Sequence, residues 1–225
     1  VWEAAGGFLL VEDAVAAHIA RAVEHGAVLQ TEETVMRWSR VGESYEVVTD
    51  RGHYRAGSLV IAPGSFVPGL LPGLDVAWQI VRKPLFWFPA RSEMYDHSRG
   101  AGVFFLETSG GEFYGFPSLD GQTVKVAEHT AGLEITDPLG VDRDVIALDL
   151  PPLVEFLQAH MPGLSTQPTH HTVCLYTRTP DGNFIVDSHP EHDGVAIGCG
   201  FSGHGFKFTP VIGSILADLA LEGTT

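Results

Sequence analysis

The sequence is short of cysteine and of positive charge, and each shortage excludes a class of protein. Only two of its 225 residues are cysteines, Cys174 and Cys199, which excludes a fold held together by a disulfide framework. Lysine and arginine number 13 against 28 acidic residues, so the formal net charge is −15. We therefore expect neither a nucleic-acid partner nor binding to an anionic membrane, because both need clustered cations.

Long hydrophobic runs are missing as well. No run approaches the ~20 apolar residues that span a bilayer, and the first residues, 1–7, do not have the charge pattern of a signal peptide. We therefore expect a cytoplasmic protein. Val1 is not an initiator methionine, so we also expect the chain to belong to a longer protein.

Several motifs of well-known sites are absent. The sequence has no HExxH, no CxxC pair, no GxSxG and no P-loop, so we expect no metal site and neither acyl nor phosphoryl transfer. Among its 11 histidines, His170 and His171 are neighbours, and in a strand they point to opposite faces. We further expect no GxGxxG motif that follows a strand, which is the signature of a dinucleotide-binding unit.

The hydrophobic pattern that is present predicts a mixed fold of the α+β or α/β class. Apolar residues at helical spacing predict helices over 13–24, 151–160 and 209–221, the last of them buried. Short alternating or apolar runs predict strands over 34–38, 45–48, 53–56, 58–62, 85–88, 103–107, 112–116, 124–128, 172–178, 183–186 and 194–197. Asp50 and Gly52 predict a hairpin turn, and the continuous apolar run 58–62 predicts a strand buried on both faces.

Three stretches contain chemically active side chains, and each has two interpretations. Alternation places Lys125 opposite the neighbouring valines, either as an exposed lysine of an edge strand or as a cation in a cavity. It places Cys174 on one strand face with Thr172 and Tyr176, either as a small buried hydrophobe or as a reactive thiol. Cys199 is interpreted as a buried hydrophobe.

The third stretch is Gly200-Phe201-Ser202-Gly203-His204-Gly205-Phe206-Lys207-Phe208, between a predicted strand and the last predicted helix. Its glycines allow the backbone to approach a ligand closely, and a helix start favours an anionic or carbonyl group. The alternative is an ordinary glycine-rich turn between a strand and a helix.

In their order and spacing, these stretches resemble the monomeric sarcosine oxidase family, which includes N-methyltryptophan oxidase, within the D-amino-acid-oxidase-like superfamily. The resemblance rests on Tyr114-Gly115-Phe116-Pro117, on Lys125 with His129, on the segment from Cys174 to Asp187, and on His189 to His192 with the glycine-rich stretch. It implies an FAD-dependent enzyme that oxidises a secondary or N-methyl amino acid to an imine and makes hydrogen peroxide.

The resemblance also implies roles for individual residues. Cys174 would carry FAD through a thioether, Lys125 would act on oxygen, and Lys207 would bind the substrate carboxylate. His204, Tyr114, His129 and Tyr176 would line the substrate side. The backbone of Gly200, Phe201, Ser202, Gly203, His204, Gly205, Phe206 and Lys207 would face the flavin.

The family begins with a strand, a GxGxxG motif and a helix, which we expect to lie outside this chain. We therefore expect residues 1–64 to be the remainder of an FAD-binding, Rossmann-like domain. Residues 65–170 would be mostly a mixed β-sheet substrate domain with flanking helices, and residues 171–225 would return to the FAD domain. The chain alone would be inactive, and the whole enzyme would be a monomer whose partners are an amino acid and oxygen. The alternatives are a non-catalytic flavoprotein-like module that needs a separate dinucleotide-binding chain, and an oxidase or dehydrogenase with noncovalent flavin.

Overall fold

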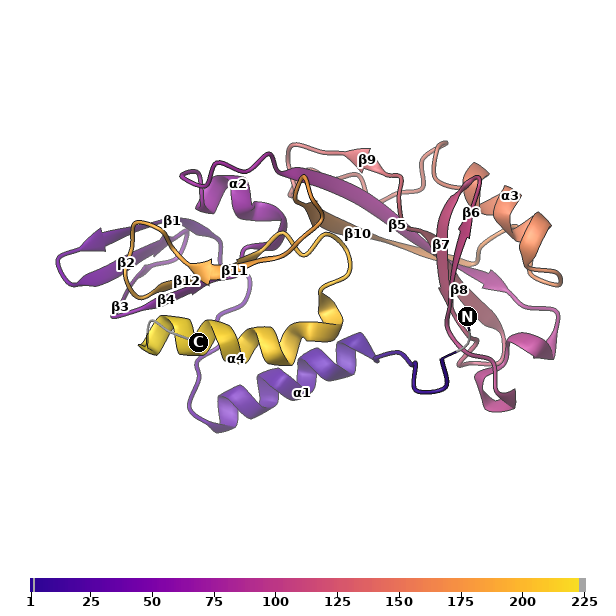
Figure 1. Cartoon of the computed structure of the whole chain (residues 1–225), viewed down its shortest axis with the longest axis horizontal. Coiled ribbons are helices and arrows are strands. Elements are labelled where there is room, and N and C mark those ends of the chain that lie inside the picture. Colours follow the sequence, from indigo (N-terminus) through magenta and orange to yellow (C-terminus); the bar gives the residue numbers. More distant parts are fainter. Residues whose placement is uncertain (2, 223–225) are drawn as a thin grey trace. The chain divides into compact units, whose positions relative to one another are not determined.

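A computed structural model describes residue 1 and residues 3–222, which form a mixed α/β fold (Figure 1). The chain divides into two compact units. Unit 1 comprises Val1–Phe8 and Ile80–Tyr176, and unit 2 comprises Leu9–Gln79 and Thr177–Thr225. The predicted domain limits at residues 64 and 170 remain predictions, because compactness divides the chain elsewhere.

Unit 1 is built on one six-stranded sheet with the strand order β10-β5-β8-β7-β6, and β9 pairs with β5. The strands are β5 (Gln79–Pro89), β6 (Phe104–Thr108), β7 (Gly111–Phe116), β8 (Thr123–Glu128), β9 (Leu133–Glu134) and β10 (His170–Arg178). Its α-helix is α3 (Pro151–His160), which has the bounds that the sequence predicts, and two short 3-10 turns, η2 (Glu93–Tyr95) and η3 (His97–Arg99), precede β6.

One face of this sheet, the helix face, packs against α3. Its core is apolar and consists of Phe86, Phe88, Phe113, Val124, Val126, Leu153, Phe156, Leu157 and Met161. The ring of Phe113 stacks on that of Phe156, with 4.1 Å between centroids. The other face, the site face, carries the side chains that alternate with this core, among them Trp87, Tyr114 and Lys125.

Unit 2 contains two three-stranded sheets. The first has the order β1-β2-β3, with β1 (Val35–Val41), β2 (Ser44–Thr49) and β3 (His53–Ala56), and the second has the order β11-β12-β4, with β4 (Leu59–Ile61), β11 (Ile185–Ser188) and β12 (Val195–Cys199). The helices are α1 (Val11–Glu24), α2 (Val67–Leu70) and α4 (Thr209–Glu222), with the 3-10 turns η1 (Gly64–Phe66) and η4 (Phe206–Phe208). The predicted hairpin is confirmed, because β2 and β3 pair antiparallel and the backbone N–H of Thr49 donates to the Gly52 carbonyl.

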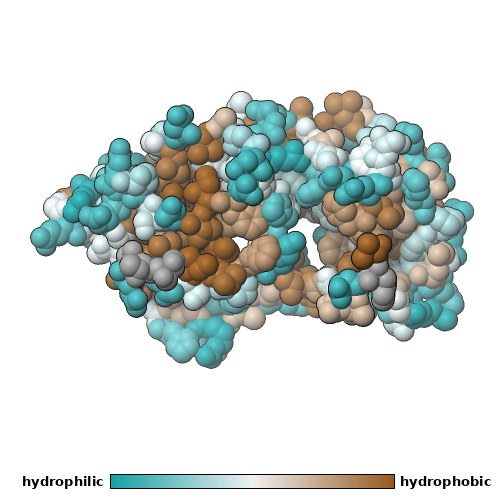
Figure 2. Space-filling view, viewed as in Figure 1, coloured by the Kyte–Doolittle hydropathy of each residue, from teal (hydrophilic) through white to brown (hydrophobic). Residues whose placement is uncertain are grey.

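Two predictions of burial in unit 2 are wrong. Val60 in β4 is 50% exposed rather than buried on both faces, because among the described strands β4 lies at the edge of its sheet and pairs only with β12. In α4 only Leu216 and Leu219 are buried, whereas Val211 is 53% exposed. A three-stranded sheet covers one side of a helix that is apolar on more than one side, and Figure 2 shows hydrophobic surface over the region of β12 and α4.

No described helix is long and apolar enough to cross a bilayer. In α1 no residue is buried, although Val15, Ile19 and Val23 have the spacing of an apolar stripe. These three residues are 39–50% exposed.

Candidate functional site

Alternation along two strands of unit 1 places the predicted site residues on one face. In β8, Val124 and Val126 point into the core on the helix face, so Lys125 points to the site face. In β10, Val173 is buried and Cys174 is exposed. The same period separates His170, whose ring lies 4.8 Å from that of Trp87, from His171, which lies against Phe86 on the other side. The prediction that these two histidines face opposite ways is confirmed.

Lys125 does not lie on an edge strand, because β8 is paired on both sides, by β5 and by β7. Its cross-strand partners are Trp87 and Phe116, and its Nζ lies 5.0 Å and 5.2 Å from the centroids of their rings. A cation against aromatic rings is stabilised by their quadrupoles. The edge-strand interpretation of Lys125 is therefore wrong, and the structure shows a half-buried cation in an aromatic setting.

Cys174 is likewise not the small buried hydrophobe of the first interpretation, because its side chain is exposed. Alternation with the buried Val173 places the thiol on the site face, where its charge would raise the pKa of Tyr114. Cys199 is fully buried, and burial raises the pKa of its thiol to about 11. The two cysteines therefore differ in access and in chemistry, and only Cys174 is placed to meet a ligand.

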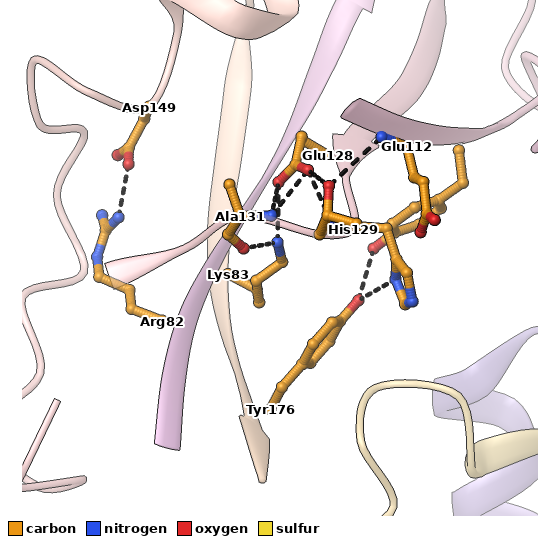
Figure 3. Close-up of polar contacts among 10 residues, drawn as sticks. Arg82, Lys83, Glu112, Glu128, His129, Ala131, Asp149 and Tyr176 are labelled. Carbon is orange, nitrogen blue, oxygen red and sulfur yellow. Dashed lines mark hydrogen bonds and ion pairs between the residues drawn. The ribbon is translucent and has the colours of Figure 1, made fainter. Parts of the chain in front are cut away.

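The side chains of Tyr114, His129 and Tyr176, from three segments, form a chain of contacts. Figure 3 labels His129 and Tyr176. The hydroxyl of Tyr176 lies 3.5 Å from that of Tyr114 and 3.5 Å from Nδ1 of His129. Burial, followed by the neighbouring Tyr176, raises the pKa of Tyr114 far above its ordinary value. Tyr114 therefore stays protonated and can donate or accept a hydrogen bond.

Lys83 of the site face and its partner Glu128 escaped sequence reasoning. Lys83, only 2% exposed, forms an ion pair with Glu128, with 3.0 Å between Nζ and Oε2. Burial raises the pKa of Glu128, but hydrogen bonds from Thr130 and Ala131 and the charge of Lys83 outweigh burial and leave the pKa below its ordinary value. The signal was present in the sequence, because Arg82 and Lys83 interrupt an apolar strand and buried cations require partners.

Arg82, the neighbour of Lys83, is also buried, and it serves a different purpose. Its guanidinium binds the Asp149 carboxylate at 2.8 Å and the carbonyls of Asp142 and Asp144 at 2.7 Å and 2.5 Å. These bonds anchor the segment that leads into α3. Arg82 therefore supports the fold of unit 1, and its side chain takes no part in the contacts of the site face described above.

The remaining predicted residues lie in unit 2, in the loop between β12 and α4. Gly200, Ser202 and Gly203 have positive φ angles of 66°, 50° and 86°, and the Ser202 backbone N–H donates to the Thr177 carbonyl at 2.9 Å. His204 contacts the Gly182 carbonyl through Nε2 at 3.2 Å, and its ring lies 4.7 Å from that of Phe184. Lys207, in η4, is exposed.

The expectation that no GxGxxG follows a strand is wrong in its literal form, because Gly198, Gly200 and Gly203 have this spacing and begin inside β12. The geometry nevertheless differs from a dinucleotide-binding turn. A Cβ at Gly198 would lie 2.8 Å from the Leu216 side chain, and one at Gly200 would lie 2.5 Å from that of Thr179. These two glycines accommodate the chain's own packing, and α4 begins only at Thr209.

The chain is similar to known proteins over nearly its whole length. The model of a family described as FAD dependent oxidoreductase matches residues 1–219. Monomeric sarcosine oxidase of Streptomyces avermitilis is 38% identical over 237 residues, and N-methyl-L-tryptophan oxidase of Salmonella dublin is 33% identical over 228. Both alignments include all of this chain and 60% of the relative, so the chain spans about three fifths of these relatives' length.

Solved structures show the same fold. The structure of NikD, an unusual amino acid oxidase essential for nikkomycin biosynthesis, matches with a TM-score of 0.80 at 25% identity, over 96% of this chain and 57% of that one. Glycine oxidase from Geobacillus kaustophilus matches with a TM-score of 0.76 at 21% identity, over 95% of this chain and 54% of that one.

Proposed function

Because the chain belongs to the FAD-dependent oxidoreductase family, we propose that it is part of an oxidase of secondary or N-methyl amino acids that makes hydrogen peroxide. The observation that carries the proposal is the grouping of an exposed thiol, a cation between aromatic rings and a Tyr-His-Tyr chain on one face of one sheet. FAD would supply the two-electron acceptor for the carbon beside the amine nitrogen and the electron donor for oxygen. We propose a cytoplasmic, monomeric enzyme.

The site face suits a flat conjugated ring. The exposed thiol of Cys174 can hold such a ring covalently through a thioether. Trp87 and Tyr114 supply apolar ring surface on the same face of the unit 1 sheet. In unit 2, we assign the backbone from Gly200 to Lys207 to the cofactor. The thioether is the part of this proposal that separates the enzyme from oxidases with noncovalent flavin.

Lys125 acts on oxygen in this proposal. Its Nζ is held by two aromatic rings, so the cation is in place before negative charge develops on oxygen. A preorganised charge in a water-poor site lowers the barrier without reorganisation during the reaction.

The substrate meets the remaining polar groups. Tyr114, His129 and Tyr176 orient the amine through their hydroxyls and imidazole, and because Tyr114 stays protonated it does not add a negative charge near the amine. In unit 2, we assign Lys207 to the substrate carboxylate, as a flexible point charge, and His204 to the substrate.

Acid precipitation of the full-length protein tests the proposal. We expect a yellow pellet from the wild type and a colourless pellet with yellow supernatant from Cys174→Ala. Cys199→Ala is the matched control and should keep the yellow pellet, because the Cys199 thiol is buried. A colourless wild-type pellet contradicts the Cys174 assignment and leaves the noncovalent alternative. Absence of peroxide from a panel of N-methyl and cyclic amino acids contradicts the activity.

A second candidate function is a non-catalytic flavoprotein-like module that needs a separate dinucleotide-binding chain. The apolar stripe of α1, formed by Val15, Ile19 and Val23, favours it because a partner would cover a stripe that is 39–50% exposed. Co-purification with a chain that carries a strand, GxGxxG and a helix would support this alternative. A reading frame that continues upstream of Val1 into that unit would contradict it.

A further inference from the structure

The buried ion pair of Lys83 and Glu128 adjoins two residues of the substrate-side contacts, Tyr176 and His129. The side chains of the two residues are 3% and 13% exposed. Lys83 also donates to the Ala131 carbonyl, while Glu128 accepts from the backbone N–H groups of Thr130 and Ala131 at 2.7 Å and 2.8 Å. Burying two charges is costly unless hydrogen bonds satisfy them, and here each charge has several partners.

The ion pair is connected to the substrate-side residues in two ways, one through Tyr176 and one through His129 (Figure 3). Nζ of Lys83 lies 5.5 Å from the centroid of the Tyr176 ring, on which a cation exerts an attraction. Glu128 directly precedes His129, and its bonds to Thr130 fix the turn that carries this histidine. The hydroxyl of Tyr176 and Nδ1 of His129 lie 3.5 Å apart, so both connections end at one contact of the site.

The pair is remote from the oxygen-side cation. Lys125 contacts Trp87, which lies four residues further along β5 than Lys83, whereas Lys83 contacts Glu128, Ala131 and Tyr176. Removing one partner of a buried ion pair is destabilising, because it leaves an uncompensated buried charge. A test of Lys83 therefore needs a measurement that a general loss of stability would not change selectively.

We propose that Lys83 is a positioning residue for substrate oxidation. Its ammonium, held by Glu128 and the Ala131 carbonyl, sets the ring of Tyr176 and so the Tyr176–His129 contact that orients the amine. The inference rests on the proposed function, because it assigns the pair to the substrate half of that reaction.

Measuring flavin reduction by substrate and reoxidation by oxygen separately distinguishes an effect of Lys83 on the substrate side from a general loss of structure. In the full-length holoenzyme, Lys83→Met should slow anaerobic flavin reduction by substrate about 10-fold or more, since misplacement of a contact group by about 1 Å can cost 10²-fold. Reoxidation by oxygen should stay within a factor of two. Lys83→Arg, which keeps the cation and its donors, should recover most of the reduction rate.

Arg143→Met, at an exposed position, is the control for removing a cation beside β10. Arg143 is another cation of unit 1 that contacts β10, through a 2.8 Å hydrogen bond to the Val173 carbonyl, and it touches neither Tyr176 nor His129 in the contacts described. It should change neither half-reaction. Equal reduction rates in Lys83→Met and wild type would overturn the proposal, as would an equal fall in both half-reactions.

A second measurement needs no turnover. In protein with ¹⁵N-labelled histidine, the ring signals of His129, identified by their loss in His129→Gln, should shift in Lys83→Met and not in Arg143→Met. If Lys83→Met does not fold, Lys83→Gln removes the same charge and carries the same comparison. Inactive wild type together with a shifted His129 signal would contradict the proposed function but not the coupling, whereas an unshifted signal contradicts the coupling.

Discussion

The two faces of the unit 1 sheet are built by the same strands and differ in almost every other respect. On the helix face, aromatic rings such as Phe113 and Phe156 pack against each other and are nearly inaccessible. On the site face, the aromatic rings of Trp87 and Tyr176 lie against cations instead. Because side chains alternate between faces along a strand, residues that stabilise the fold and residues of the candidate site lie on opposite faces. Substitutions on the helix face should therefore change stability, and substitutions on the site face should change reaction rates.

The largest expected effect is on stability, from the helix face. Phe113→Ala removes a ring that is 1% exposed, and we expect it to lower the free energy of unfolding by about 3–5 kcal/mol. Denaturant unfolding of the full-length flavoprotein measures it. Phe105→Ala is the control, because this ring is 52% exposed and its loss should cost about 0.5 kcal/mol or less. Similar losses of unfolding free energy in the two variants would show that the buried ring contributes no more to stability than the exposed one.

On the site face, Lys125→Met should affect rate rather than stability. Removing a preorganised charge typically costs about 10²–10³-fold, so reoxidation of the reduced protein by oxygen should slow by that factor while reduction by substrate remains. Stopped-flow absorbance measures both steps. Arg99→Met removes an exposed cation that pairs with Glu93 at 3.0 Å, and it should leave both rates unchanged. Unchanged oxygen reactivity in Lys125→Met would remove its assigned role.

A smaller effect on stability is expected at Gly115, where one added methyl group would not fit. A Cβ at Gly115 would lie 2.4 Å from the Phe104 ring and 2.7 Å from the Lys125 carbonyl. Gly115→Ala should therefore lower stability by about 1–3 kcal/mol, measured by the same unfolding experiment. Gly110→Ala meets only Thr108, at 3.7 Å, and should be close to neutral. A neutral Gly115→Ala would show that β6 and β7 can move apart.

The smallest expected effect is on the turn that joins β7 to β8, two neighbouring strands of the unit 1 sheet. Backbone hydrogen bonds from Thr123, followed by those from Gln122, lower the pKa of Asp120 to about 2. A lowered pKa means that the stabilisation is present above the ordinary aspartate pKa of about 3.9 and is lost as the pH falls towards 2. The stability difference between wild type and Asp120→Asn should be about 1 kcal/mol at pH 7.

Urea unfolding from pH 7 down to pH 2 measures this difference. It should narrow progressively below pH 4. A difference that stays constant over this range would show that the charge of Asp120 does not stabilise the turn.

Local hydrophobic spacing was enough to predict most helices and strands and the sheet face on which the candidate site residues lie. The alternation of Val124, Lys125 and Val126 predicts which of them enters the core, because the period of a strand is fixed by its geometry. The bounds of α3 and the β2–β3 hairpin follow in the same way from apolar spacing and turn residues. The assignment of roles to Lys125, Cys174 and Lys207 came from resemblance and remains a prediction.

The sequence alone could not predict which distant segments form ion pairs or lie side by side in a sheet. The ion pair of Lys83 with Glu128 joins residues 45 positions apart, and the bond of Arg82 with Asp149 joins residues 67 apart. Neither follows from a local period, because strand order and loop paths decide which partner a buried cation meets. For the same reason the exposure of Val60 depends on which strand lies beside β4.

Unit 2 is assembled from two pieces that leave the ribosome at different times. Tyr45 in β2 donates its hydroxyl to the carbonyl of Asp193, 148 positions later, and β4 pairs with β12 across all of unit 1. At 5–20 residues per second, the first piece waits roughly 10 s for the second. Unit 1 is complete earlier, so it can fold while β4 still lacks β12. During that interval the unpaired β4 edge needs protection from other chains, and slow translation would lengthen its exposure to aggregation.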